Sequence, residues 1–142
     1  MLELKSLFEN DVEKDLIKKI KKTNDYSTAI SLVTNRKNKA KLKNEENVKT
    51  LLSFILRSKQ SIVVFSLINE SYIKSATHKE LKFIMTYLLM NKSDLNCLAL
   101  NRMLDYIEEK YDLDKKIEKI GLRQDVLYIL QGYMYFKKYG IK

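Results

Sequence analysis

The sequence predicts an all-α fold, and three observations support this prediction. Proline is absent from the 142 residues and glycine occurs only three times, whereas the tight corners of a β-sandwich or barrel need both residues. Apolar residues recur at spacings of three and four along nearly the whole chain, which is the period of an amphipathic helix. Hydrophobic residues make up 45% of the sequence, enough for a core. We expect a single domain over residues 1–142, either a compact antiparallel bundle or a helical-hairpin array of about seven helices.

The first two predicted helices each carry one apolar face. In the first helix this face consists of Val12, Leu16, Ile17 and Ile20. Asn24 and Asp25 are suited to end this helix and to cap the next one. The apolar face of the second helix consists of Tyr26, Ala29, Ile30 and Val33. The polar residues 35–38 that follow predict a loop.

The next helix is predicted to begin at Asn44. A capping amide followed by Glu45 and Glu46 satisfies the free amides of the first turn and complements the helix dipole. Residues 61–75 predict one further helix. The β-branched run at 62–65 would also fit a short strand, but the apolar stripe continues beyond it with helical spacing.

Two further helix starts and one helix interruption are predicted in the remaining residues. Thr77 and Glu80 form the pattern of a capping box, and Ser93 with Asp94 begins another helix. The residues of that helix that are predicted to be buried in the core are Leu98, Leu100, Met103, Leu104, Ile107 and Tyr111. A last helical segment covers about 114–139, where Gly121 is a candidate interruption. Its apolar side is predicted to carry Ile117, Ile120, Leu122, Val126, Ile129, Leu130, Tyr133 and Phe136.

Positive charge is concentrated in one segment. Lys and Arg number 27 against 18 Asp and Glu, a net charge of +9. Residues 14–43 hold ten basic residues and two aspartates, which gives that segment +8. This surface would suit nucleic acid or another acidic partner; the alternative is a solvated face of a lysine-rich chain. The candidate contact residues are Lys14, Lys18, Lys19, Lys21, Lys22, Arg36, Lys37, Lys39, Lys41 and Lys43.

The sequence offers little for catalysis. His78 is the only histidine, and its predicted place at a helix start beside Lys79 disfavours a proton-accepting imidazole. Cys97 is the only cysteine and is predicted to be a core residue. The acidic pairs at 45–46 and 108–109 diverge on a helix because neighbouring residues are turned by about 100°. We therefore expect no enzymatic activity, no catalytic or metal-binding residues and no cofactor.

The chain is predicted to be intracellular, in the nucleus or the cytoplasm. One cysteine cannot form a disulfide framework, which fits a reducing compartment. The residues at the start lack the apolar core of a signal peptide. No stretch reaches the roughly 18 uncharged apolar residues of a membrane span, so no membrane contact is expected.

Aromatic residues are concentrated near the end of the sequence. The segment 128–136 contains three tyrosines and one phenylalanine, which helical spacing spreads around the helix. Three uses fit this pattern: a protein interface, stacking on single-stranded bases with Lys137 and Lys138 along the backbone, or a helix buried on all sides. The candidate interface residues are Tyr128, Tyr133, Tyr135 and Phe136.

Several stretches together resemble one known family. Residues 16–20 read as a basic helix, 25–33 as a short second helix, and 40–57 as an acidic turn followed by a helix that ends Leu-Leu-Ser-Phe-Ile-Leu-Arg. Residues 122–134 are similar to a closing helix with a single glycine. In this order they resemble the C-terminal helical domain of the U-three small nucleolar RNA-associated protein fifteen family.

The resemblance implies an assembly domain of the small-subunit processome, which acts on pre-ribosomal RNA in the nucleolus. Other protein subunits would then be the partners, in a homo- or hetero-oligomer, and RNA would be a further contact of the basic segment. Two other readings stay open. One is a direct nucleic-acid-binding module that uses residues 14–43, and the other is a viral Bcl-2-like helical regulator.

Overall fold

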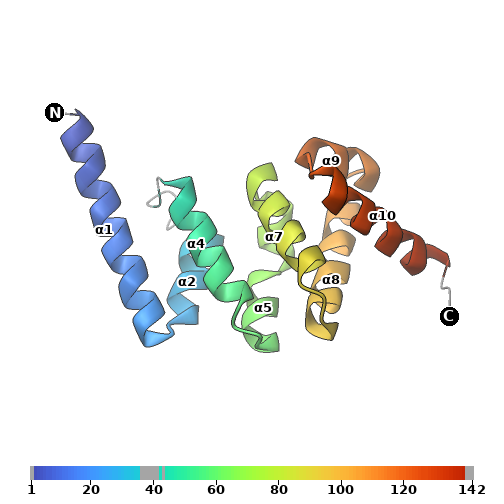
Figure 1. The fold of residues 1–142 in the computed structure, drawn as a ribbon, viewed down its shortest axis with the longest axis horizontal. Coiled ribbons are helices and arrows are strands. Elements are labelled where there is room, and N and C mark those ends of the chain that lie inside the picture. Colours follow the sequence, from blue (N-terminus) through green and yellow to red (C-terminus); the bar gives the residue numbers. More distant parts are fainter. Residues whose placement is uncertain (1, 36–41, 43, 140–142) are drawn as a thin grey trace. The chain divides into compact units, whose positions relative to one another are not determined.

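The structure is a computed structural model that describes residues 2–35, 42 and 44–139, with no side-chain description before residue 12. The described residues form helices and no strand, which confirms the all-α prediction (Figure 1). The helices are α1 (Leu2–Thr23), α2 (Tyr26–Thr34), α4 (Glu45–Leu56), α5 (Ser61–Leu67), α6 (Glu70–Ser75), α7 (His78–Met90), α8 (Asp94–Lys110), α9 (Leu113–Ile120) and α10 (Gln124–Tyr139). The described part of the chain thus holds nine helices, more than the seven or so predicted.

Two interruptions account for the larger number. The prediction of a single helix over 61–75 is wrong. The backbone leaves the helical conformation at Ile68, where φ is −87° and ψ is 74°. The side-chain oxygen of Asn69 then accepts a hydrogen bond from the backbone N–H of Tyr72 at 2.9 Å, which caps α6. The predicted interruption at Gly121 is confirmed. Its φ of 69° ends α9 in the left-handed region, where a residue without a Cβ is favoured.

The predicted helix starts are confirmed where the caps are described. The side chain of Asn44 accepts a hydrogen bond from the backbone N–H of Glu46 at 2.9 Å, and Thr77 and Glu80 form a reciprocal capping box. Asp25 caps α2 by accepting from the backbone N–H of Thr28 at 3.1 Å. Hydrogen bonds from the side chain and backbone of Thr28 lower the pKa of Asp25. Caps of this kind are worth about 1 kcal/mol each.

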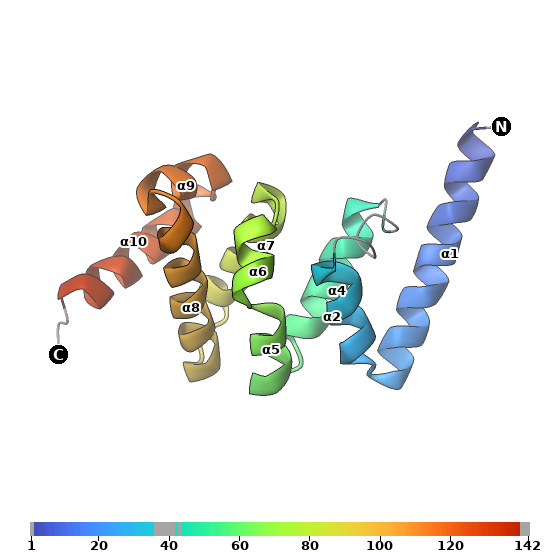
Figure 2. The same ribbon diagram turned by 180° about the vertical axis from the view of Figure 1, so that it is seen from behind.

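The contacts divide the chain into two compact units, Met1–Tyr72 and Ile73–Lys142. In the first unit α4 is the central helix and contacts α1, α2 and α5; Figure 2 shows α2 lying against α4. Leu51, Leu52 and Ile55 of α4 are fully buried there. Tyr26 of α2 stacks on Phe54 with ring centroids 4.6 Å apart, which joins the two helices further.

The buried face of α1 differs from the predicted one. Ile17 and Ile20 are buried as expected, but Val12 and Leu16 are exposed and Glu13 is buried. The Glu13 carboxylate accepts a hydrogen bond from the side-chain amide of Asn47 on α4 at 3.3 Å. Because a buried polar group is tolerated when it is hydrogen-bonded, Glu13 takes the place that an apolar residue was expected to fill.

The second unit is organised around α7, which contacts α8, α9 and α10. Ile84 and Met85 of α7 pack in a core with Met103 of α8 and with Val126 and Leu130 of α10, all of them fully buried. None of the described helices combines the length and the apolar character that crossing a bilayer requires.

The predictions that Leu98 and Cys97 lie in the core are wrong. Leu98 is 56% exposed and Cys97 is also exposed. The buried face of α8 instead begins at Asn96, whose side-chain amide donates to the backbone carbonyl of Asn91, and continues at Ala99 and Leu100. A face that starts at residue 96 turns residues 97 and 98 toward solvent, because successive helix residues are rotated by about 100°.

Candidate functional site

The described residues hold no group of three or more His, Cys, Asp or Glu side chains that would ligate a metal ion. His78 is the first residue of α7 and is exposed. Cys97 lies on the exposed side of α8. The features that can recognise a partner are two exposed helix surfaces, one basic and one aromatic, and a hollow beside the aromatic one.

The basic surface lies on α1. Lys14, Lys18, Lys21 and Lys22 are all exposed and are here called the lysine face. Lys14, Lys18 and Lys22 follow one another four residues apart, so their Cα atoms step about 6 Å along one side of the helix. They turn away from the buried face that holds Ile17.

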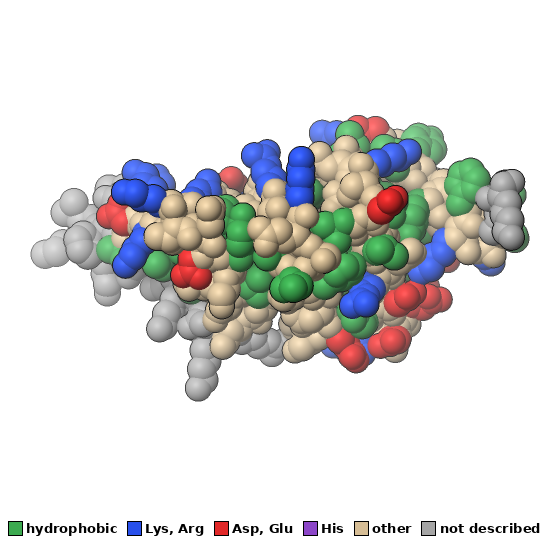
Figure 3. Space-filling model, turned by 90° about the horizontal axis from the view of Figure 1, so that it is seen from below, with side chains coloured by type: hydrophobic (Ala, Val, Ile, Leu, Met, Phe, Trp, Pro, Cys, Tyr) green, Lys and Arg blue, Asp and Glu red, His purple; other side chains and the backbone are tan. Residues whose placement is uncertain are grey.

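No residue that the structure describes forms an ion pair with the lysine face. Like charges four residues apart on a helix repel one another, and an anionic partner relieves that repulsion. Figure 3 shows basic side chains at its left end, where the carboxyl-terminal half of α1 lies.

The other predicted basic contacts are not all on this face. Lys19 is exposed on α1 but is turned toward the side that carries Leu16. Arg36, Lys37, Lys39, Lys41 and Lys43 lie outside the residues that the structure describes. Their part in partner binding stays a prediction.

The aromatic surface lies on α10. Its members are large apolar side chains that remain at least a third exposed: Tyr128 64%, Ile129 36%, Tyr135 54%, Phe136 56% and Tyr139 60%. These five residues are here called the aromatic face. The Tyr135 ring contacts Phe136 edge-on at 6.3 Å between centroids and Tyr139 at 4.7 Å. In Figure 3, hydrophobic side chains lie at the surface at the right-hand end, the end to which α10 belongs.

Gly132 occupies the middle of the aromatic face. A Cβ added there would meet nothing within 4 Å, so the backbone of α10 is open to solvent at that point. A glycine in the middle of a helix costs roughly 1 kcal/mol relative to alanine. The monomer gains no packing from its absent side chain, whereas a second helix would be able to approach closely there.

Tyr133 is set apart from the other predicted interface residues. It is half-buried, and its hydroxyl donates a hydrogen bond to the backbone carbonyl of Cys97 on α8 at 3.2 Å. Burial raises the pKa of Tyr133, and the nearby Cys97 and Asp105 raise it further. Lys137 of α10 also pairs with Asp105 at 2.8 Å. Tyr133 and Lys137 therefore hold α10 against α8, whereas Tyr128, Tyr135 and Phe136 remain exposed.

This arrangement corrects two expectations about α10. Ile129 and Phe136 were predicted to lie on the apolar side that faces the core, and both are exposed. The helix is therefore not buried on all sides. Ile129 and Tyr139 belong to the aromatic face although they were not among the predicted interface residues. Helical spacing was the available signal, since Tyr139 follows Tyr135 by four residues and Phe136 by three, and Ile129 precedes Phe136 by seven residues, about two turns.

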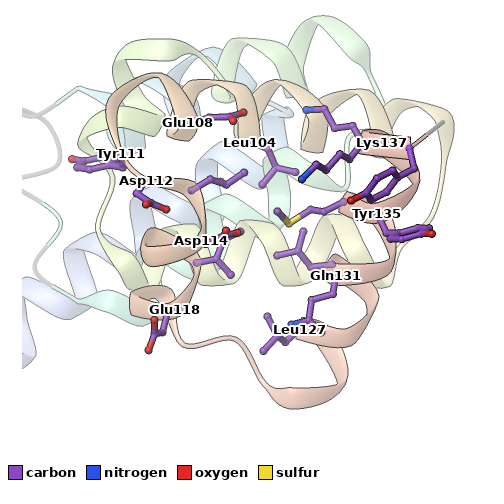
Figure 4. Close-up of a pocket in the computed structure, with 16 residues that line it drawn as sticks. Leu104, Glu108, Tyr111, Asp112, Asp114, Glu118, Leu127, Gln131, Tyr135 and Lys137 are labelled. Atoms are coloured by element: carbon purple, nitrogen blue, oxygen red, sulfur yellow. The ribbon is translucent and has the colours of Figure 1, made fainter.

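A hollow of about 1050 Å³ lies between α8, α9 and α10, beside the aromatic face (Figure 4). Its floor is apolar, formed by Leu104, Ile117 and Leu130. Figure 4 shows the carboxylates of one rim opposite Tyr135 and Lys137 of α10. The rim carboxylates belong to Glu108, Asp112, Asp114 and Glu118.

An apolar floor with an acidic rim suits a segment that carries both apolar and cationic side chains. No pattern in the sequence predicted this hollow. Its lining comes from three helices, and their packing brings together residues as far apart as 104 and 139.

The chain matches no protein-family model, and no curated protein or solved structure is similar to it at a significant level. The likeness to the processome family therefore stays a prediction that depends on the residues given above.

Proposed function

We propose that this chain is a non-catalytic, helical protein-interaction domain that works within a ribonucleoprotein assembly. The observation that carries the proposal is the aromatic face of α10. Five large apolar side chains on one helix remain at least a third exposed, although the opposite side of the same helix is anchored in the core by Val126 and Leu130. Contiguous exposed apolar patches on a folded domain mark places where another molecule binds.

The composition of this face favours a protein partner. Tyrosine and phenylalanine are enriched at the centres of protein interfaces. Fully burying such a side chain gains about 1.5 to 3 kcal/mol, so covering the exposed half of each ring gains roughly 1 kcal/mol. Base stacking would need several cations along the same side; Lys137 is already paired with Asp105, which leaves Lys138, whose ammonium group lies 5.6 Å from the centre of the Tyr139 ring. Protein binding therefore explains the face better than base stacking does.

The lysine face of α1 and the resemblance described above support a ribonucleoprotein setting. A net charge of +9 suits surroundings rich in phosphate. On this proposal the chain is a subunit domain in ribosome biogenesis, located in the nucleolus, and it acts as one helical domain built as a bundle or a hairpin array. Other protein subunits are its partners, and RNA is a neighbour of α1.

A second candidate function is direct nucleic-acid binding through α1. The specific observation in its favour is the lysine face, whose ammonium groups have no ion-pair partner among the described residues. Such binding would be independent of sequence and sensitive to salt.

The two functions are separated by affinity purification from native cells, followed by mass spectrometry. The test variant is Tyr128→Ser/Tyr135→Ser/Phe136→Ser, and the control is Ile62→Ser/Met90→Ser, which changes exposed apolar residues elsewhere. We expect the unchanged chain and the control to retain subunits of a pre-ribosomal assembly at high salt, and the test variant to lose them. Equal retention by both variants, or no retained protein at all, would contradict the proposal. Loss only on charge reversal of the lysine face would favour the second candidate.

A further inference from the structure

We infer that the hollow between α8, α9 and α10 is a second binding site, whose occupant is a short segment of a partner protein that carries apolar side chains next to arginine or lysine. The inference goes beyond the proposed function, which depends on the aromatic face. Tyr128, Ile129 and Phe136 of that face do not line the hollow, and only Tyr135 and Tyr139 do.

The size and the walls of the hollow suit several side chains at once. Its volume of about 1050 Å³ is at the upper end of the range for pockets that enclose a whole drug-sized ligand. Besides the floor residues, Leu113 of α9 and Leu127 and Met134 of α10 line the hollow, and all three are only half-buried. Covering their exposed apolar surface is favourable, and the flexible methionine adapts to apolar groups of different shape.

The rim carries carboxylates that the chain itself leaves uncompensated. Those of Glu108, Asp114 and Glu118 form no hydrogen bond or ion pair with any residue that the structure describes. Asp114 and Glu118 are four residues apart on α9, a spacing at which like charges on a helix repel each other. In a chain with a net charge of +9, the rim is therefore a local reversal of sign that attracts a cation.

The lysines beside the hollow have other contacts. Lys137 is held by the ion pair with α8 described above, and the ammonium group of Lys138 lies 5.6 Å from the centre of the Tyr139 ring. Lys116 of α9 does not line the hollow, and its ammonium group lies 4.3 Å from the centre of the Tyr111 ring. The rim carboxylates are thus left for a cation of another molecule.

Charge and apolar surface together determine the class of the occupant. Carboxylates repel the phosphates of nucleic acids and of anionic lipids, and a metal ion would leave the apolar walls exposed to water. A protein segment satisfies both parts, because its apolar side chains fill the hollow while an arginine binds carboxylates through paired hydrogen bonds. Figure 4 shows the carboxylates of Glu108 and Glu118 on the α8 and α9 side and Leu127 and Gln131 on the α10 side. The cationic side chains of the segment would therefore point toward α8 and α9.

The first test selects peptides from a phage-displayed random library on the full chain. We expect the enriched peptides to combine apolar residues with arginine or lysine. Their affinity, measured by fluorescence polarisation, should fall at least about threefold for Glu108→Gln/Glu118→Gln, which removes two exposed charges without changing the shape of the side chains. The control Asp15→Asn/Glu46→Gln makes the same change of charge at exposed positions of α1 and α4 and should leave the affinity unchanged.

The second test locates the bound peptide by nuclear magnetic resonance of isotope-labelled methionine methyl groups. Met134 lines the hollow, whereas Met90 is exposed on α7 and does not line it. Saturation with an enriched peptide should shift the Met134 methyl signal and leave the Met90 signal in place.

A library that yields no peptide, enriched peptides that are acidic or uncharged, equal affinity for the two double variants, or an unshifted Met134 signal would overturn the inference. If the aromatic face still retained pre-ribosomal subunits from cells, the proposed function would stand without it. Rim-dependent peptides would support the inference even if Tyr128→Ser/Tyr135→Ser/Phe136→Ser retained every subunit, a result that would contradict only the proposed function.

Discussion

Two truncations on α10, one on its buried side and one on its exposed side, should lower the free energy of unfolding by very different amounts. Leu130 is fully buried, so Leu130→Ala removes packed atoms and leaves a cavity; the free energy of unfolding should fall by about 3 kcal/mol. Phe136 is 56% exposed. Less than half of its ring is covered and no closed cavity would form, so Phe136→Ala should cost about 1 kcal/mol or less. The expected difference between the two variants is therefore about 2 kcal/mol.

Urea unfolding followed by far-ultraviolet circular dichroism measures both values. Dilute protein keeps self-association from adding to the stability. Met90→Ala is a useful reference, since Met90 is 50% exposed on another helix of the same unit and should behave like Phe136→Ala. Equal losses of stability from Leu130→Ala and Phe136→Ala would show instead that α10 is buried on all sides and has no free aromatic face.

Three further predictions concern other parts of the chain. Gly121→Ala forces a side chain into a φ of 69° and should lower the free energy of unfolding by about 1 kcal/mol; an unchanged urea midpoint would contradict the strain argument. Burial raises the pKa of Tyr133 above its ordinary value of 10.0. On raising the pH, the unfolded chain therefore loses this proton before the folded chain does, and the free energy of unfolding falls as pH rises above 10.0. Tyr133→Phe should lack this contribution to the pH dependence, which urea unfolding at several pH values measures. If RNA contacts the lysine face, Lys18→Glu/Lys22→Glu should reduce the slope of log affinity against log salt by about 1.4 for single-stranded RNA, and an unchanged slope would exclude this contact.

Local signals in the sequence predicted much of the fold. The caps at Asn44 and Thr77 depend on side chains that bind backbone amides two or three residues away, so their chemistry is complete within a short window. The end of α9 at Gly121 is equally local, since a residue without a Cβ adopts a positive φ at little cost. The break at Asn69 is also a cap, but the continuous apolar run around it concealed the signal.

The burial of individual faces was harder to predict. Val12, Leu16 and Leu98 are apolar and were expected inside, yet they are exposed, whereas Glu13 and Asn96 are buried. Glu13 is accommodated by a partner that the local sequence does not reveal, the amide of Asn47, far along the chain on α4. Asn96 has a nearby partner, since its amide donates to the carbonyl of Asn91. The hydrophobic periodicity predicts that a segment is helical, but the helices that pack against it determine which part of its surface is buried.

The same limit applies to the candidate site. Its aromatic composition was evident from the sequence, but the division of α10 into an anchored side and a free side depends on Tyr133 reaching the Cys97 carbonyl of α8. The hollow between α8, α9 and α10 depends on the packing of three helices, and no linear pattern contains that information.

Hydroxyl-radical footprinting tests most directly whether the aromatic face is a binding surface. The chain is labelled in isolation and in the assembly purified from its native cells, and oxidation of Tyr128, Tyr135 and Phe136 is compared by mass spectrometry. We expect these rings to react readily in the isolated chain and to be protected in the assembly, while Ile62, 82% exposed, and Met90 react equally in both. Equal oxidation of the three rings in both samples would contradict this expectation.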